Sequence, residues 1–155
     1  GKMDLVVSHW WGSTTDTRFI RNTSSLGSIS GVMFNYNNSP NAFYMRYLNV
    51  SDIDGDGKID VFGAEGSTST LRVYRNTSTS TGINQSSFSP AVGFPLINTE
   101  GRMQAVDLTG DGRPEIIQFT TSARLYIWPN QIADPATITG ISPNPAIAGV
   151  SIVSV

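Results

Sequence analysis

Residues 51–60 of the sequence, SDIDGDGKID, crowd four aspartates and two glycines into ten positions. Side chains at alternate positions of a tight turn converge on one point, so Asp52, Asp54, Asp56 and Asp60 can surround a cation, and the carbonyl of Lys58 can add one more oxygen. Hard oxygen ligands in that number suit Ca²⁺, which takes six to eight of them, better than Zn²⁺, which prefers nitrogen and sulfur. The glycines supply the dihedral angles that let the backbone curl around an ion. This first acidic loop therefore predicts a calcium site.

A second acidic loop, DLTGDGRPE at residues 107–115, keeps the same spacing. Asp107 and Asp111 occupy two of the acidic positions, Thr109 places a hydroxyl where the first loop has a carboxylate, and Glu115 lengthens the last acidic side chain. We expect this loop to bind the same ion more weakly.

Two other interpretations of the loops are open from the sequence. An EF-hand needs a glutamate at its twelfth position on an outgoing helix, but the chain has Gly63 and Gln118 there, and both following segments resemble strands. Ordinary Asp-Gly turns without a metal are the second alternative. We favour the calcium loop over both.

The acidic loops belong to a repeated unit. The segments GKMDLVV, GKIDVFG and GRPEIIQ begin at residues 1, 57 and 112, and Asn22, Asn76 and Asn130 recur downstream at intervals of 54. A fixed repeat position predicts that these asparagines make the same turn hydrogen bond in each copy. Phe34 and Phe88 each follow their asparagine by twelve residues.

Each copy is predicted to consist of β-strands. Apolar segments at 45–50 and 103–108 precede the acidic loops, those at 59–64 and 115–120 follow them, and further strands are expected at 70–76, 86–92 and 123–130. Four strands in a unit of about 55 residues, without a helical period, predict an all-β fold built from the antiparallel blades of a β-propeller. The chain holds about two and a half such units, fewer than the roughly four to eight blades of a closed propeller. We therefore expect a segment of a larger protein.

The stretches DIDGDGKIDVFGAEGSTSTLRVYRNTS and VDLTGDGRPEIIQFTTSARLYIWPN resemble the FG-GAP/VCBS repeats of integrin-α-type propellers. In those repeats the acidic loop joins the first two strands of a blade. The resemblance implies side-chain ligands at the same positions of both loops, with Arg113 contributing its carbonyl as Lys58 does. These ligands are Asp52, Asp54, Asp56 and Asp60 in the first loop and Asp107, Thr109, Asp111 and Glu115 in the second. It also makes Asp4 the last ligand of a third site whose earlier ligands are not in this chain.

The predicted domain organisation places propeller blades at residues 1–132 and a linker with the start of a second β domain at 133–155. The Pro-rich tail PATITGISPNPAIAGVSIVSV resembles the opening of an immunoglobulin-like IPT/TIG domain and, more weakly, the start of a C-terminal sorting domain of secreted bacterial proteins. An ordered linker is the third alternative. Either domain resemblance implies an exported multidomain protein.

Composition limits the classes of partner. The net charge of −2 arises from acids gathered in and beside the acidic loops, and no basic cluster predicts nucleic-acid binding. The sequence has no run of eighteen apolar residues, so it predicts no membrane span. The absence of cysteine excludes disulfides and thiol catalysis. No catalytic constellation is recognisable, so we expect a protein that is not an enzyme.

The predicted function is adhesion to, or recognition of, a glycan or a protein by a calcium-stabilised propeller outside the cell or at its surface. In a four-stranded meander the recognition loops lie opposite the calcium turns, and Trp10 and Trp11 in the segment HWWGSTTD could stack on a sugar or a peptide ring. The alternatives are a non-catalytic accessory propeller of a secreted polysaccharide-active enzyme and a structural spacer. The remaining blades of the same protein are expected partners.

Overall fold

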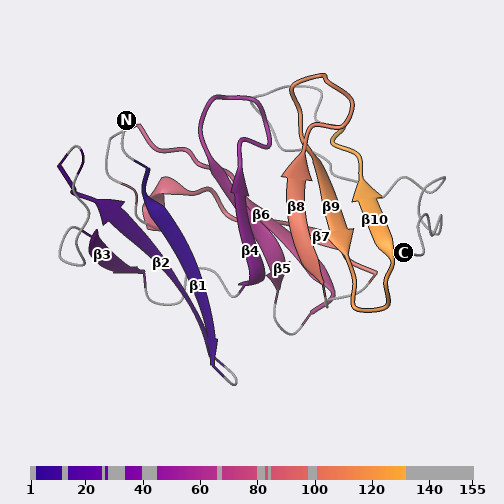
Figure 1. The fold of residues 1–155 in the computed structure, drawn as a ribbon, viewed down its shortest axis with the longest axis horizontal. Coiled ribbons are helices and arrows are strands. Elements are labelled where there is room, and N and C mark those ends of the chain that lie inside the picture. The colour runs from indigo at the N-terminus through magenta and orange to yellow at the C-terminus, as the bar shows by residue number, and fades with distance from the viewer. Residues whose placement is uncertain are drawn as a thin grey trace.

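The computed structural model describes residues 3–11, 14–25, 27, 34–39, 45–65, 68–79, 83, 85–97 and 101–131. These residues form antiparallel β-strands arranged in three consecutive sheets (Figure 1), which confirms the all-β prediction. The strands are β1 (Leu5–Trp11), β2 (Thr14–Asn22), β3 (Phe34–Ser39), β4 (Met45–Ser51), β5 (Asp60–Glu65), β6 (Thr70–Tyr74), β7 (Val92–Pro95), β8 (Arg102–Val106), β9 (Glu115–Phe119) and β10 (Leu125–Trp128).

The sheets follow the order of the chain. The first sheet has the order β1-β2-β3, the middle sheet β4-β5-β6-β7, and the third sheet β8-β9-β10. The first acidic loop joins β4 to β5 and the second joins β8 to β9, as the repeat pattern predicts. The middle sheet is thus a complete four-stranded meander that begins with its acidic loop between the first two strands.

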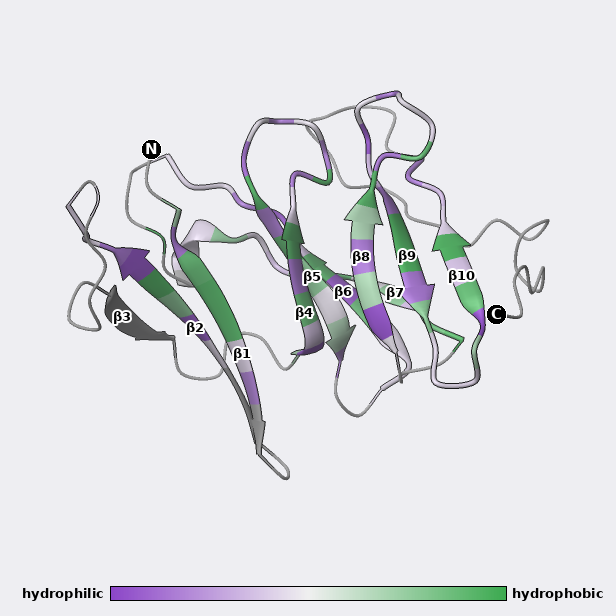
Figure 2. Ribbon diagram, viewed as in Figure 1, coloured by the Kyte–Doolittle hydropathy of each residue, from purple (hydrophilic) through white to green (hydrophobic). Residues whose placement is uncertain are grey.

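The middle and third sheets pack face to face through one hydrophobic core. Phe62, Leu71 and Val73 on one side meet Met103, Ile116 and Trp128 on the other. Because β5 has a neighbouring sheet on each face, its residues from Asp60 to Ala64 are all buried. Burial on both faces explains why the sequence of β5 reads as a continuous apolar run. Figure 2 shows similar hydrophobic stretches on β1, β9 and β10.

A second core joins the first sheet to the middle sheet. Phe19 of β2 packs with Met45 and Val61, and its ring stacks on that of Phe88 with 5.3 Å between the centroids. The hydroxyl of Ser8 donates a hydrogen bond to the carbonyl of Met45 across the same interface, at 2.7 Å. The middle sheet therefore offers one face to the first sheet and the opposite face to the third sheet.

The outer strand of the middle sheet differs from the prediction of a strand at 86–92. Residues Gln85–Ser87 form one 3₁₀ turn, Phe88 makes an isolated bridge to Asn76, and regular pairing resumes only at β7. Pro90 has no N–H to donate to a neighbouring strand, which accounts for the interruption. The bridge still matches the first sheet, where Phe34 pairs with Asn22.

A β-bulge distinguishes β4 from its counterpart β8. The register of β4 against β5 shifts between Arg46 and Asn49, and Tyr47 adopts a left-handed φ of 53°. Gly63 of β5 lies opposite this bulge, and a Cβ there would come within 3.1 Å of the Arg46 carbonyl oxygen. In the third sheet, Gln118 occupies the position of Gly63 and pairs with Met103 in a regular ladder.

Candidate metal centre

The backbone of the first acidic loop is folded around the carboxylate of Asp52. Its Oδ1 accepts a hydrogen bond from the N–H of Gly55, and its Oδ2 accepts one from the N–H of Gly57, each at 2.8 Å. Gly55 and Gly57 have φ angles of 76° and 83°, which L side chains rarely adopt. The spacing D-x-x-G-x-G therefore produces this turn because the glycines allow the curl and the aspartate binds the amides that the curl exposes.

Three carboxylates of the loop converge. Asp52, Asp54 and Asp60 each offer an oxygen atom, and these atoms all lie within 4.8 Å of one another. Asp54 and Asp60 are 0% exposed. A carboxylate carries about four lone-pair positions, so the oxygens of Asp52 can bind a cation as well as the loop amides.

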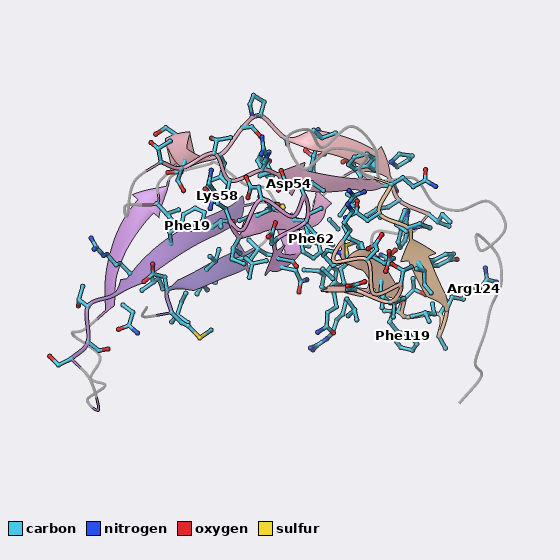
Figure 3. The ribbon with its side chains drawn as sticks, turned by 90° about the horizontal axis from the view of Figure 1, so that it is seen from above. Phe19, Asp54, Lys58, Phe62, Phe119 and Arg124 are labelled. Carbon is cyan, nitrogen blue, oxygen red and sulfur yellow. The ribbon has the colours of Figure 1, made fainter. Side chains whose placement is uncertain are left out.

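Asp56 and Lys58 complete the predicted ligand set but are placed differently. The Asp56 carboxylate is not in the converging group; its Oδ1 accepts from the N–H of Lys58 at 2.9 Å, and its Oδ2 lies 3.8 Å from Nζ of Lys58. Figure 3 shows Lys58 and Asp54 in the same part of the molecule. The ligand roles of Asp56 and of the Lys58 carbonyl stay predictions.

Asp60 ties the end of the loop to two buried peptide groups. Its Oδ2 accepts from the N–H of Ile53 at 2.9 Å and its Oδ1 accepts from the N–H of Asn76 at 2.8 Å. Burial raises the pKa of Asp60 to about 6, and the negative charges of Asp54 and Asp56 act in the same direction, although the two amide hydrogen bonds oppose them. A cation in the loop would neutralise this buried negative charge.

Arg75 is a member of the site that the spacing of the acids did not reveal. Its Nε donates to Oδ2 of Asp54, and its Nη2 donates to Oδ2 of Asp56 at 3.0 Å. Asp54 is fully buried, whereas the Arg75 side chain is 25% exposed. The available signal was the arginine directly before the repeated asparagine in VYRN, which also occurs in FIRN at Arg21.

The second acidic loop has the same backbone. Asp107 accepts from the N–H groups of Gly110 and Gly112 at 2.7 and 2.9 Å, and these glycines have φ angles of 76° and 82°. Hydrogen bonds from these amides lower the pKa of Asp107, with the Gly112 N–H having the largest effect. Glu115 accepts from the N–H of Leu108 at 2.8 Å, as Asp60 does from that of Ile53.

The side chains of the second loop differ from those of the first. Asp107, Asp111 and Glu115 do not gather into a group like that of the first loop, which is the one such group in the described part of the chain. Thr109 takes the position of Asp54. Pro129 stands directly before its repeated asparagine, at the position that Arg75 has in the middle sheet's repeat. The buried acid and its basic partner are thus replaced together. The roles of Thr109, Asp111, Glu115 and the Arg113 carbonyl stay predictions.

Asp4 occupies the position in the first sheet that Asp60 has in the middle sheet. Its Oδ1 accepts from the N–H of Asn22 at 2.8 Å, which matches the bond from Asn76 to Asp60. This confirms that the two acids are structurally equivalent. The ligand role of Asp4 stays a prediction.

The repeated asparagines make the predicted turn hydrogen bond in two copies. The Oδ1 atom of Asn22 accepts from the N–H of Ser24 at 2.9 Å, and that of Asn76 accepts from the N–H of Ser78 at 3.0 Å. Asn130 is buried, and its side-chain amide donates to the carbonyls of Ile53 and Pro114.

Some predicted features lie outside the described residues. Trp10 and Trp11 end β1, where their backbones pair with Thr15 and Thr14, but their side chains are not among those described, so the stacking hypothesis stays a prediction. The tail at 133–155 also lies outside the described residues.

The position of the first acidic loop, between the first two strands of a four-stranded antiparallel sheet, permits a comparison with known families. Residues 52–118 match the FG-GAP-like repeat. The matched segment contains both acidic loops and the whole of β5, β6 and β7, and an FG-GAP-like repeat indicates a propeller-type domain. No curated protein and no solved structure matches the chain. In the part of the chain that the structure describes, no helix has the length and apolarity needed to span a bilayer.

Proposed function

We propose that the FG-GAP-like repeat of this chain is a calcium-stabilised structural unit whose first acidic loop is the principal metal site. The observation that carries the proposal is the convergence of oxygens from Asp52, Asp54 and Asp60 within 4.8 Å of one another. These hard, anionic oxygens suit Ca²⁺, and no nitrogen or sulfur ligand belongs to the group. Calcium supplies positive charge that joins the two ends of the loop and thereby holds β4 against β5.

Calcium binding should stabilise the fold, because a ligand that binds the native state alone shifts the unfolding equilibrium. At a free concentration one hundred times the dissociation constant, the gain is about 2.7 kcal/mol. Isothermal titration with CaCl₂ and thermal unfolding of the full chain test this. We expect heat of binding, a rise in the midpoint with added calcium, and a return to the starting value with a chelator.

Two matched variants separate the loops. The double variant Asp52→Asn, Asp54→Asn should abolish the tighter calcium-binding event, whereas the single variant Asp107→Asn should leave that event unchanged. The calcium proposal would be disproved if the unfolding midpoint of the unaltered chain changed neither with calcium nor with the chelator.

We further propose that the whole protein acts outside the cell or at its surface, in adhesion to, or recognition of, a glycan or a protein. The match to an FG-GAP-like repeat supports a propeller-type domain, and such a scaffold carries recognition on loops at one end of its strands. Trp10 and Trp11 lie at the end of β1 that is opposite Asp4, and therefore opposite the acidic end of the repeat. We propose no catalytic role for the ion or for the described side chains.

A glycan array and a surface-protein binding screen, each with the intact protein, test the recognition role. Replacement of Trp10 and Trp11 by alanine should weaken binding without changing the unfolding midpoint. Unaltered binding by this double variant would remove the tryptophans from the proposal, and the absence of any ligand would favour a structural spacer.

A further inference from the structure

A hydrogen bond joins the first acidic loop to the neighbouring sheet. Nδ2 of Asn130, which follows β10 in the third sheet, donates to the carbonyl of Ile53 at 2.8 Å and to the carbonyl of Pro114 at 3.2 Å. Both bonds are buried. The bond to Pro114 stays within the third sheet and matches the one that Asn76 makes to Ile59 in the middle sheet. The bond to Ile53 crosses from one repeat to the next.

Ile53 is held on three sides. Its N–H donates to Asp60, its carbonyl accepts from Asn130, and its side chain is 0% exposed in the core shared by the middle and third sheets. Trp128 and Ile116 of the third sheet belong to that core. One residue of the acidic loop is thus also a residue of the interface between sheets.

We propose that cation binding in the first acidic loop and docking of the third sheet on the middle sheet are energetically coupled through Ile53, with Asn130 as the positioning residue. This inference rests on the proposed calcium site and names a consequence of occupying it. Asn130 lies in another repeat and is not proposed as a ligand.

The geometry of the loop explains how the coupling would work. The carbonyl of Ile53 belongs to the same planar peptide unit as the N–H of Asp54, so the bond from Asn130 fixes the peptide that leads into a converging carboxylate. The N–H of Ile53 fixes a second converging carboxylate, that of Asp60. Because Asn130 already holds the loop in this arrangement, less conformational entropy is lost when the cation binds. By linkage, the bound cation must favour the docked third sheet by the same free energy.

The coupling is specific to the interface that lies between these two sheets. Leu108, the counterpart of Ile53 in the second acidic loop, is 52% exposed, although its N–H donates to Glu115 just as that of Ile53 donates to Asp60. Among the described residues the second loop therefore lacks the apolar contact that places Ile53 in the interface.

The test is calcium affinity, measured by isothermal titration of the full chain in an Asp107→Asn background that silences the second loop. We expect Asn130→Ala to lower the affinity about tenfold, within the range typical of coupled sites. Leu108→Ala is the matched control, because its exposed side chain in the second loop lies outside the core that the middle and third sheets share. Its calcium affinity should stay within about twofold of the parent, since coupled effects of this kind are larger.

Hydrogen exchange on the unaltered chain provides a measurement that needs no variant to fold. Added calcium should slow amide exchange in β8, β9 and β10 as well as in β4 and β5. Protection confined to residues 45–79, or an Asn130→Ala affinity equal to that of the parent, would overturn the coupling while leaving the calcium site intact. Absence of any calcium binding to the unaltered chain would overturn the site and the coupling together.

Discussion

Arg75 donates a hydrogen bond from its guanidinium to the buried carboxylate of Asp54, 21 residues earlier in the chain. The same guanidinium reaches Asp56, so a positive side chain from the end of β6 already neutralises part of the acidic loop. A carboxylate with no exposed surface requires such a partner when no metal is bound. Arg75 would therefore compete with the proposed calcium ion for the same negative charge.

Replacement of Arg75 by methionine, which keeps the aliphatic stem, should change stability and affinity in opposite directions. Without calcium, the unpaired Asp54 should lower the free energy of unfolding by about 1–3 kcal/mol, less than for a fully buried pair because Arg75 is partly in solvent. Calcium affinity should rise about tenfold, the equivalent of ~1.4 kcal/mol of removed competition. Urea unfolding with a chelator and calorimetric titration measure the two quantities.

Arg75→Lys is the control, since it keeps the positive charge and should stay closer to the parent in both measurements. A fall in calcium affinity for Arg75→Met would mean that Arg75 orients Asp54 toward the cation instead of competing with it.

The asparagines of the repeat offer a matched pair of substitutions. Asn76 is buried, and its side chain donates to the Ile59 carbonyl and accepts from the Ser78 N–H. Asn76→Ala leaves the Ile59 carbonyl and the Ser78 N–H without this partner. It should lower the free energy of unfolding by about 1–3 kcal/mol. Asn22→Ala, at the half-buried equivalent position, should cost less, because water can reach the groups that it frees. Equal losses in urea unfolding for the two variants would contradict this explanation.

The local features of the site could be predicted from the sequence. Asp52, Gly55 and Gly57 lie within six residues and make one turn, so their spacing alone predicts the loop, and the repeat period predicted the bond from Asn76 to Ser78. The contributions of Arg75 and Asn130 depend on how strands and sheets pack, and the bond from Asn130 to Ile53 joins residues 77 positions apart. No local spacing encodes contacts of that kind.

The β-bulge in β4 was also beyond prediction, because it depends on a glycine in the adjacent strand. A Cβ at Gly63 would lie 3.1–3.2 Å from backbone atoms of Arg46, Tyr47 and Leu48. Gly63→Ala should therefore lower the free energy of unfolding by about 1–3 kcal/mol, as overpacking against backbone typically does. Chemical denaturation measures the change.

Gly93→Ala is the control for this substitution. Its Cβ would meet the side chains of Arg72 and Thr70, which can move aside, so we expect a cost under about 1 kcal/mol. A Gly63→Ala protein as stable as Gly93→Ala would show that the bulge relaxes, and Tyr47 should then lose its left-handed φ.

Equivalent positions in successive repeats test whether the sheets stack in the order described. Ile53 and Leu108 occupy the same place in the two acidic loops, yet Ile53 is buried against the third sheet and Leu108 is 52% exposed. Phe119, the counterpart of the buried Ala64, is likewise 55% exposed, and Figure 3 shows it at the outer edge of the molecule, away from Phe62. The third sheet therefore presents an apolar face like the one that the middle sheet buries.

Substitution by alanine at the two loop positions should have unequal costs in this chain. Ile53→Ala removes methyl groups from a packed core and should lower the free energy of unfolding by about 2–5 kcal/mol. Leu108→Ala should lower it by less than about 1 kcal/mol. Urea unfolding at several protein concentrations measures both changes. A large cost for Leu108→Ala that grows with protein concentration would contradict the exposed face, because it would mean that a second copy of the chain covers the third sheet as the third sheet covers the middle one.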